Sequence, residues 1–200
     1  ILPMLTRAEL LGQIMRNYDT PIAISGTHGK TTTTSMVSHI LLAGDCDPTI
    51  SVGGILPAIG GNIRVGKSDT FITEACEYTN SFLSFAPTVG IILNVAADHL
   101  DFFKDLDDIR HSFRRYAELL PANGALIING DIDNLEYFTK DLDCKVITVG
   151  SEESGSMYTA KNITFDEFAH GSYDLYVEGE FKHRVTLKVT GMHNIYNSLA

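Results

Sequence analysis

Residues 25–34, with the sequence SGTHGKTTTT, constrain the fold of this chain more than any other segment. An apolar run at residues 21–24 precedes them, and apolar residues at helical spacing follow: Met36, Val37, Ile40 and Leu41. A strand, a glycine loop and a helix in this order form a phosphate cradle, because backbone N–H groups turn inward and the helix N-terminus adds partial positive charge. Lys30 and the Thr31 hydroxyl would complete a site for a nucleoside triphosphate and Mg²⁺.

The match to the general phosphate-loop pattern is partial. The pattern G-x-x-x-x-G-K-[ST] requires glycine at position 24, where this chain has Ile24. Clusters of glycine and threonine also form ordinary turns. The position of Gly29, Lys30 and Thr31 between a strand and a helix favours phosphate binding over a simple turn.

Composition limits the partners. The 200 residues are 44% hydrophobic and 20% charged, which is typical of one globular domain. A net charge of −10 argues against nucleic acid or an anionic membrane surface as a partner, since both would be repelled. A bound nucleotide would therefore need a metal ion.

Several features predict a cytoplasmic piece of a longer protein. No apolar run approaches the length of a membrane span, and the first residues lack the basic region of a signal peptide. Cys46, Cys76 and Cys144 are far apart without a C-x-x-C pair, so we expect reduced thiols. The chain starts without methionine and stops where a helix pattern begins.

The apolar pattern predicts an α/β fold of the phosphate-loop type, with a mostly parallel sheet and helices on both faces. Strands are expected at residues 21–24, 48–52, 70–73, 89–94, 125–128 and 145–149, and helices at 7–17, from Lys30, from Asp105 and at 135–140. Beyond residue 155, alternating segments at 158–165, 173–177 and 181–189 predict a small antiparallel meander with turns at 170–171 and 178–180. The glycine-rich residues 53–66, with a possible hairpin near 63–65, either simply turn or contact a substrate.

Acidic residues end two of the predicted strands. Glu74 follows one strand, and Asp98 and His99 follow another. In an open parallel sheet the carboxyl ends of the strands share one edge, so these side chains should meet the phosphate loop. Thr31 and Glu74 offer the hard oxygen ligands that suit Mg²⁺.

The role of His99 has two readings. It could bind a second metal or hydrogen-bond an acceptor, or it could be structural, and the neighbouring Asp98 and Asp101 favour a functional role. Glu77 is open between a functional and a solvated side chain.

Four motifs in chain order resemble the Mur ligases. They are GTHGKTTT at residues 26–33, EACEY at 74–78 followed by SFL at 81–83, Asn94 with DHLD at 98–101, and GMHNIYN at 191–197. The resemblance covers the whole chain, and the shortened loop of the family accounts for Ile24. It implies that residues 1–200 are the central ATP-binding domain of a three-domain enzyme, with the N-terminal UDP-binding and C-terminal amino-acid-binding domains absent.

The resemblance also implies a reaction. In the branch most similar to this chain, ATP phosphorylates the carboxylate of UDP-N-acetylmuramate, and the amine of L-alanine attacks the acyl phosphate during peptidoglycan synthesis. Without its flanking domains, this chain should bind nucleotide but ligate little or nothing.

Roles for individual residues follow from the same resemblance. The catalytic residues would be Lys30, Glu74 and His99. Thr31 and Glu74 would hold a first Mg²⁺, and His99 a second. The ATP-binding residues would be Gly26, Thr27, His28, Gly29, Lys30, Thr31, Thr32, His193, Asn194 and Asn197.

Three alternatives remain from the sequence. A murein peptide ligase of cell-wall recycling attaches a tripeptide to the same uridine nucleotide and shares much of the phosphate-loop region. A P-loop kinase or motor-type NTPase would need a full loop pattern and a strand ending in aspartate. A nucleotide-binding module without ligase activity is disfavoured by the presence of Lys30, Glu74 and His99 together.

Overall fold

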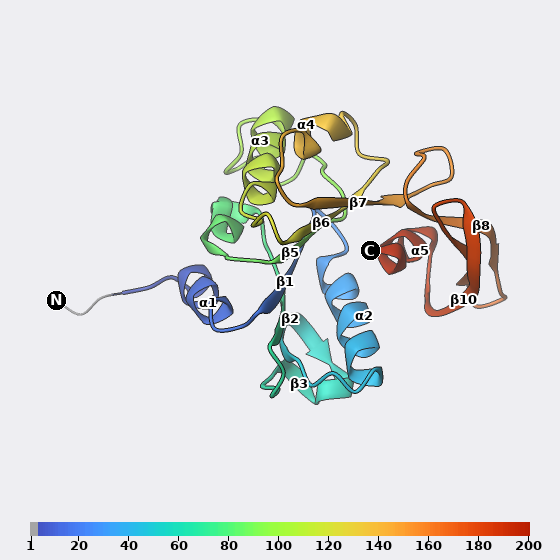
Figure 1. Ribbon diagram of the computed structural model, residues 1–200, viewed down its shortest axis with the longest axis horizontal. Coiled ribbons are helices and arrows are strands. Elements are labelled where there is room, and N and C mark those ends of the chain that lie inside the picture. Colours follow the sequence, from blue (N-terminus) through green and yellow to red (C-terminus); the bar gives the residue numbers. More distant parts are fainter. Residues whose placement is uncertain (1–3) are drawn as a thin grey trace.

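The computed structural model describes residues 4–200 as one ten-stranded sheet in the order β10-β9-β8-β7-β6-β5-β1-β4-β2-β3 (Figure 1). The strands are β1 Thr20–Ser25, β2 Thr49–Leu56, β3 Gly61–Arg64, β4 Thr70–Glu74, β5 Val89–Ile92, β6 Ala125–Asn129, β7 Lys145–Gly150, β8 Tyr158–Phe165, β9 His170–Val177 and β10 Glu180–Thr190. The helices are α1 Arg7–Met15, α2 Lys30–Ala43, α3 Leu106–Ala117, α4 Leu135–Thr139 and α5 Met192–Leu199, with short 3-10 helices η1 Pro57–Ile59 and η2 Tyr78–Ser84.

The sheet is mostly parallel, as the sequence predicts. Each neighbouring pair from β8 to β2 is parallel, whereas β3, β9 and β10 add antiparallel strands at the two ends. The predicted meander is confirmed and continues the main sheet, because β8 pairs with the end of β7. The central register places Ile24 beside Glu74 and Ser25 beside Ile92, so the ends of β4, β1 and β5 meet at one edge.

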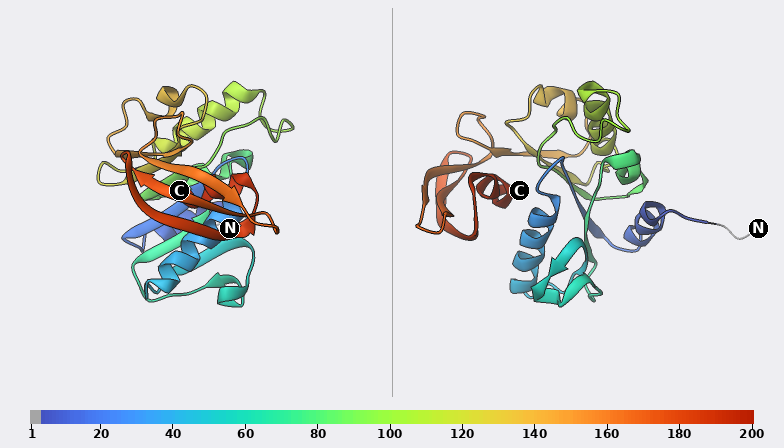
Figure 2. Two further views of the ribbon diagram at one scale, coloured as in Figure 1. Left: turned by 90° about the vertical axis from the view of Figure 1, so that its right-hand side faces the viewer. Right: turned by 180° about the vertical axis from the view of Figure 1, so that it is seen from behind.

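Helices cover both faces of the sheet, which also agrees with the predicted fold class (Figure 2). Successive residues of β1 point to opposite faces, so Ala23 joins a core with α1, α3 and η2, while Ile24 joins another with α2. The apolar residues Ile109, Phe113 and Tyr116 of α3 are buried, and the ring of Tyr116 stacks on Phe82 at 4.9 Å. The Tyr116 hydroxyl donates a 2.7 Å hydrogen bond to the Ala23 carbonyl oxygen, and burial raises the pKa of this phenol.

Two details differ from the predictions. The turn expected at residues 170–171 is wrong, because both residues lie in β9 and the chain reverses earlier. There the Asp166 carboxylate accepts hydrogen bonds from the backbone N–H groups of Phe168 and His170. Strand β2 is longer than expected, so Gly53 lies within a strand that forms an irregular hairpin with β3.

Between residues 4 and 200, no helix is both long and apolar enough to cross a membrane.

Candidate functional site

The loop between β1 and α2 presents an uncapped helix N-terminus. Gly29 is the N-cap of α2, with φ +88°, and therefore no side chain caps the first backbone N–H groups. A Cβ atom at Gly29 would lie 2.8 Å from Oδ1 of Asn197, so glycine also permits the close approach of α5. The first turn of this helix continues through Thr32, which is partly exposed. Free N–H groups at a helix N-terminus favour an anion.

Asn94, after β5, fixes the shape of this loop. Its Oδ1 accepts a 2.8 Å hydrogen bond from the His28 backbone N–H, and its Nδ2 donates to the His28 carbonyl oxygen at 2.9 Å. The Thr27 hydroxyl likewise accepts from the Ala96 backbone N–H at 2.9 Å. The buried Gly26 and Thr27 are thus held from the neighbouring strand end, while the His28 side chain is exposed.

Lys30 is held within the loop by a buried acid. Its Nζ donates to the carbonyl oxygens of Gly26 at 2.6 Å and Thr27 at 3.2 Å, and forms a 2.9 Å ion pair with Glu77. Glu77 is only 2% exposed. The reading of Glu77 as a solvated side chain is therefore wrong, because the chain after β4 turns its carboxylate inward onto the lysine.

Thr31 and Glu74 meet in front of the helix. The Thr31 hydroxyl donates to Glu74 Oε2 at 3.0 Å, and the Gly53 backbone N–H donates to Oε1 at 2.6 Å. The sequence motifs therefore converge here as expected from the strand order. One carboxylate and one hydroxyl fit Mg²⁺, which usually takes one or two carboxylates and completes its shell with phosphate oxygens and water. Residues 4–200 contain no cluster of three His, Cys, Asp or Glu side chains arranged for a metal ion.

His99 lies on the other side of the lysine pair. Its Nε2 is 3.9 Å from Glu77 Oε1, and its ring centroid is 4.6 Å from that of Tyr78. The Tyr78 hydroxyl donates to Asp101 at 2.8 Å, which raises the pKa of Tyr78. Within residues 4–200, the His99 side chain therefore contacts Glu77 and Tyr78, and it makes no direct contact with Thr31 or Glu74.

The C-terminal helix closes the other end of the loop. Asn194 and Asn197 are buried, and Asn197 Nδ2 donates to Asn194 Oδ1 at 3.0 Å, whereas His193 is exposed. A cavity of about 150 Å³ opens between this helix and the ends of three strands. Its lining residues are Leu93, Asn94, Asn129, Val149, His193, Tyr196 and Asn197.

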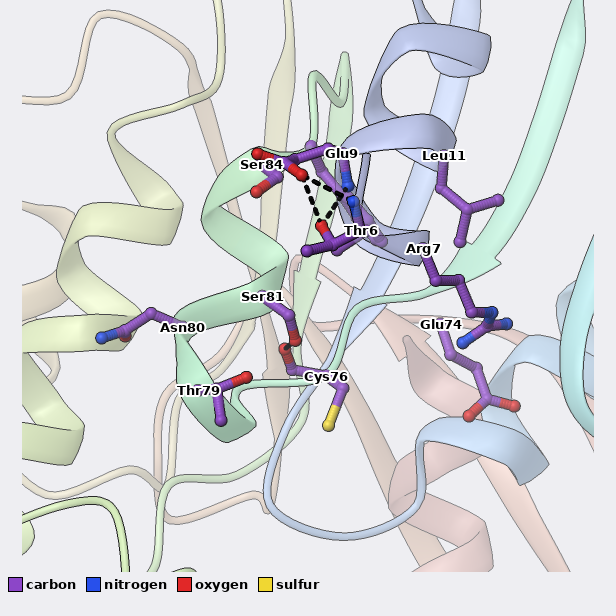
Figure 3. A pocket seen from close by; sticks show the side chains of 12 residues that line it. Thr6, Arg7, Glu9, Leu11, Glu74, Cys76, Thr79, Asn80, Ser81 and Ser84 are labelled. Carbon is purple, nitrogen blue, oxygen red and sulfur yellow. Dashed lines mark hydrogen bonds between the residues drawn. The ribbon is translucent and has the colours of Figure 1, made fainter. Parts of the chain in front are cut away.

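A larger cavity of about 430 Å³ lies on the far side of Glu74, between α1 and η2 (Figure 3). The side chains of Arg7, Glu74 and Cys76 line it together with hydroxyl groups of η2. Figure 3 shows the Glu74 carboxylate at the end of this cavity that faces α2. The Glu74 carboxylate therefore lies between Thr31 at the start of α2 and a cavity that is lined by the basic side chain of Arg7.

The family model of the Mur ligase middle domain matches residues 24–200 of this chain. The chain belongs to this family. The UDP-N-acetylmuramate–L-alanine ligase of Lachnospira eligens is 66% identical over 199 residues, which cover all of this chain and 43% of that protein. The chain thus spans less than half the length of this relative.

Solved structures of Mur ligases share the fold. The UDP-N-acetylmuramate:L-alanyl-γ-D-glutamyl-meso-diaminopimelate ligase of Neisseria meningitides is 27% identical, with a TM-score of 0.87 over 99% of this chain and 64% of that one. The UDP-N-acetylmuramate-alanine ligase of Thermotoga maritima is 26% identical, with a TM-score of 0.80 over 95% of this chain and 42% of that one.

Within this Mur ligase domain, sequence reasoning undervalued two residues and missed one. The sequence leaves the role of Glu77 open and shows Gly53 only as part of a glycine-rich segment, yet both residues contact site residues directly. Arg7, which lines the larger cavity, was not singled out. The close spacing of Glu74 and Glu77 after a buried strand was the available signal for Glu77, whereas nothing local marks Gly53 as a partner of Glu74.

Proposed function

We propose that this chain is the central, ATP-binding domain of a ligase that joins L-alanine to UDP-N-acetylmuramate in peptidoglycan synthesis. The name and 66% identity of the Lachnospira eligens relative support this reaction. The observation that carries the proposal is the meeting of Thr31 and Glu74, 3.0 Å apart, in front of an uncapped helix that begins with Lys30.

ATP would lie along the loop between β1 and α2. Gly26, Thr27 and His28 would line the phosphates, the backbone N–H groups of residues 29–32 would bind them, and Lys30 would move from Glu77 to the γ-phosphate. His193, Asn194 and Asn197 would contact the adenine from the cavity beside α5. Side-chain amides can both donate to and accept from the edge of an adenine ring.

Thr31 and Glu74 would hold a first Mg²⁺, and His99 would contribute to a second. Mg²⁺ at this place neutralises the charge of the phosphates. Glu77 lies between Lys30 and His99, so it would orient both side chains.

The reaction would place an acceptor carboxylate in the cavity between α1 and η2, where Arg7 offers positive charge beside Glu74. A carboxylate oxygen attacks the γ-phosphorus, and ADP leaves. The amine nitrogen of L-alanine then attacks the acyl carbon, loses a proton and expels inorganic phosphate. The flanking parts of the longer protein would bind the uridine nucleotide and the amino acid, and the whole enzyme would act in the cytoplasm, where ATP is available.

A second candidate is a murein peptide ligase. The Neisseria meningitides structure favours it, because that ligase superposes on 99% of this chain with a TM-score of 0.87. Product formation by the full-length protein with L-alanine and with tripeptide separates the two candidates. Turnover with L-alanine alone supports the first proposal, and turnover with tripeptide alone supports the second.

Calorimetric titration of the full-length protein with a non-hydrolysable ATP analogue, with and without Mg²⁺, tests the nucleotide site. We expect that Mg²⁺ strengthens binding of the analogue, that this gain is reduced in Glu74→Ala, and that Lys30→Ala loses ligase activity. A folded protein that binds no analogue under either condition would contradict the proposed site.

A further inference from the structure

Strand β2 passes unusually close to the Glu74 carboxylate. Regular pairing between β2 and β4 ends at Ser51 and Thr73, and the register between β2 and β3 shifts after Ser51. The backbone N–H of Gly53, just beyond this point, donates a 2.6 Å hydrogen bond to Glu74 Oε1. A charge-assisted hydrogen bond from a backbone N–H is among the stronger and more directional contacts a carboxylate can make.

The two oxygens of Glu74 have different partners. Oε1 accepts from Gly53, whereas Oε2 accepts from the Thr31 hydroxyl at 3.0 Å. Oε2 is therefore the oxygen that lies next to the Thr31 hydroxyl, the other predicted Mg²⁺ ligand. The bond to Oε1 can persist when Oε2 binds a metal ion, because the two contacts use different oxygens of the carboxylate.

The absence of a side chain at position 53 is required for this contact. A Cβ atom on Gly53 would lie 2.7 Å from Glu74 Oε2 and 3.0 Å from Oε1, closer than such atoms normally approach. Glu74 is the end of a flexible side chain, so the carboxylate would move while the backbone stayed in place. The φ of Gly53 is not in the left-handed region, so alanine fits the backbone itself.

We propose that Gly53 is a positioning residue for Glu74: its N–H orients the carboxylate toward Thr31, and its missing Cβ leaves room for it. This inference rests on the proposed function, in which Glu74 binds Mg²⁺. Groups that orient a metal ligand typically contribute 10- to 100-fold to metal affinity. Gly53→Ala should therefore weaken metal binding and leave the fold intact.

The test uses Mn²⁺ as a paramagnetic probe with the full-length protein and a non-hydrolysable ATP analogue. Electron paramagnetic resonance measures the Mn²⁺ affinity of the protein–nucleotide complex, and thermal unfolding measures stability. For Gly53→Ala we expect at least about a tenfold loss of Mn²⁺ affinity, an unchanged Tm and unchanged binding of the analogue without metal.

Gly61→Ala is the matched control. Gly61 lies in the same hairpin, its φ is not in the left-handed region, and a Cβ atom there would have no atom within 4 Å. This variant should bind Mn²⁺ like the unchanged protein. The double variant Gly53→Ala/Glu74→Gln should bind Mn²⁺ no more weakly than Glu74→Gln alone, because Gly53 acts only through Glu74.

The possible outcomes separate the two proposals. Unchanged Mn²⁺ affinity in Gly53→Ala, while Glu74→Gln loses it, would overturn the role of Gly53 alone. A fall in Tm with loss of metal-free analogue binding, or additive effects in the double variant, would also overturn it. Unchanged Mn²⁺ affinity in Glu74→Gln would instead overturn the metal site of the proposed function.

Discussion

Lys30 and Glu77 form a nearly buried ion pair, with side chains 16% and 2% exposed. Removing one partner of a buried pair leaves an uncompensated charge, whereas replacing both with apolar residues of similar size is often neutral. Lys30 therefore has two roles in this structure. It faces the predicted phosphate site, and it compensates the charge of Glu77.

We predict that Lys30→Met lowers the free energy of unfolding by about 3 kcal/mol, because Glu77 loses its partner. Lys30→Met/Glu77→Leu should recover most of that loss and remain inactive as a ligase. Urea denaturation and an assay of ADP release measure the two effects. A single variant as stable as the unchanged protein, or a double variant that regains activity, would contradict this account.

The sequence places some site residues better than others for a physical reason. Glu74 ends β4, and Lys30 and Thr31 begin the helix after β1, so the order of the strands brings them to one edge of the sheet. Glu77 lies instead at a local reversal of the chain: its carbonyl oxygen accepts a 2.9 Å hydrogen bond from the Asn80 N–H, and Thr79 and Asn80 have φ values of +55° and +56°. Left-handed conformations at ordinary residues are set by tertiary packing, which apolar periodicity does not reveal.

At the scale of elements, α3 shows how a local signal specifies a helix start. Asp105 is the N-cap, where the sequence predicts the helix to start, and its carboxylate accepts a 2.9 Å hydrogen bond from the Asp108 backbone N–H. Buried residues of the same helix contact η2, which begins directly after Glu77; the ring of Phe113, for example, packs against Phe82. Helix α3 thus packs against the segment that follows Glu74.

We predict that Asp105→Ala lowers the free energy of unfolding by about 1 kcal/mol, because one helix N–H loses its acceptor. Asp107→Ala is the control, since Asp107 lies in the first turn and forms only an exposed pair with Arg110 at 3.0 Å. That variant should cost a few tenths of a kcal/mol. Urea denaturation measures both variants. Equal losses in the free energy of unfolding would mean that the negative charge, and not the capping hydrogen bond, stabilises the start of the helix.

Element boundaries fail where glycine has a role other than turning. The predicted strand at residues 48–52 ended before Gly53, because glycine usually weakens a strand, yet β2 runs to Leu56. The turn predicted at residues 170–171 failed similarly, since Gly171 lies in β9 against Ile195. In both places glycine permits a close approach, and close approaches are properties of the folded molecule.

At the scale of the whole molecule, the continuous sheet returns the C-terminus to the phosphate loop. The meander extends the sheet beyond β7, and α5 then packs back against it through Ile195, which is fully buried. The Tyr173 hydroxyl on β9 is 2.8 Å from that of Ser198 on α5. Asn197 thereby reaches Gly29, although the two residues lie 168 positions apart in sequence. Alternation predicts the meander, but not the docking of this helix.

Helix α5 contacts the site at Gly29 and not at Thr31 or Glu74. A change in α5 should therefore weaken nucleotide binding without weakening metal binding. We predict that Asn197→Ala weakens binding of the ATP analogue by about tenfold, the equivalent of one or two lost hydrogen bonds. The Mn²⁺ affinity of the protein–nucleotide complex should stay unchanged, since Thr31 and Glu74 remain in place. Met192→Ala, on an exposed position of the same helix, is the control. Equal losses of nucleotide and Mn²⁺ affinity in Asn197→Ala would show instead that the helix holds the entire loop, including Thr31, in its binding conformation.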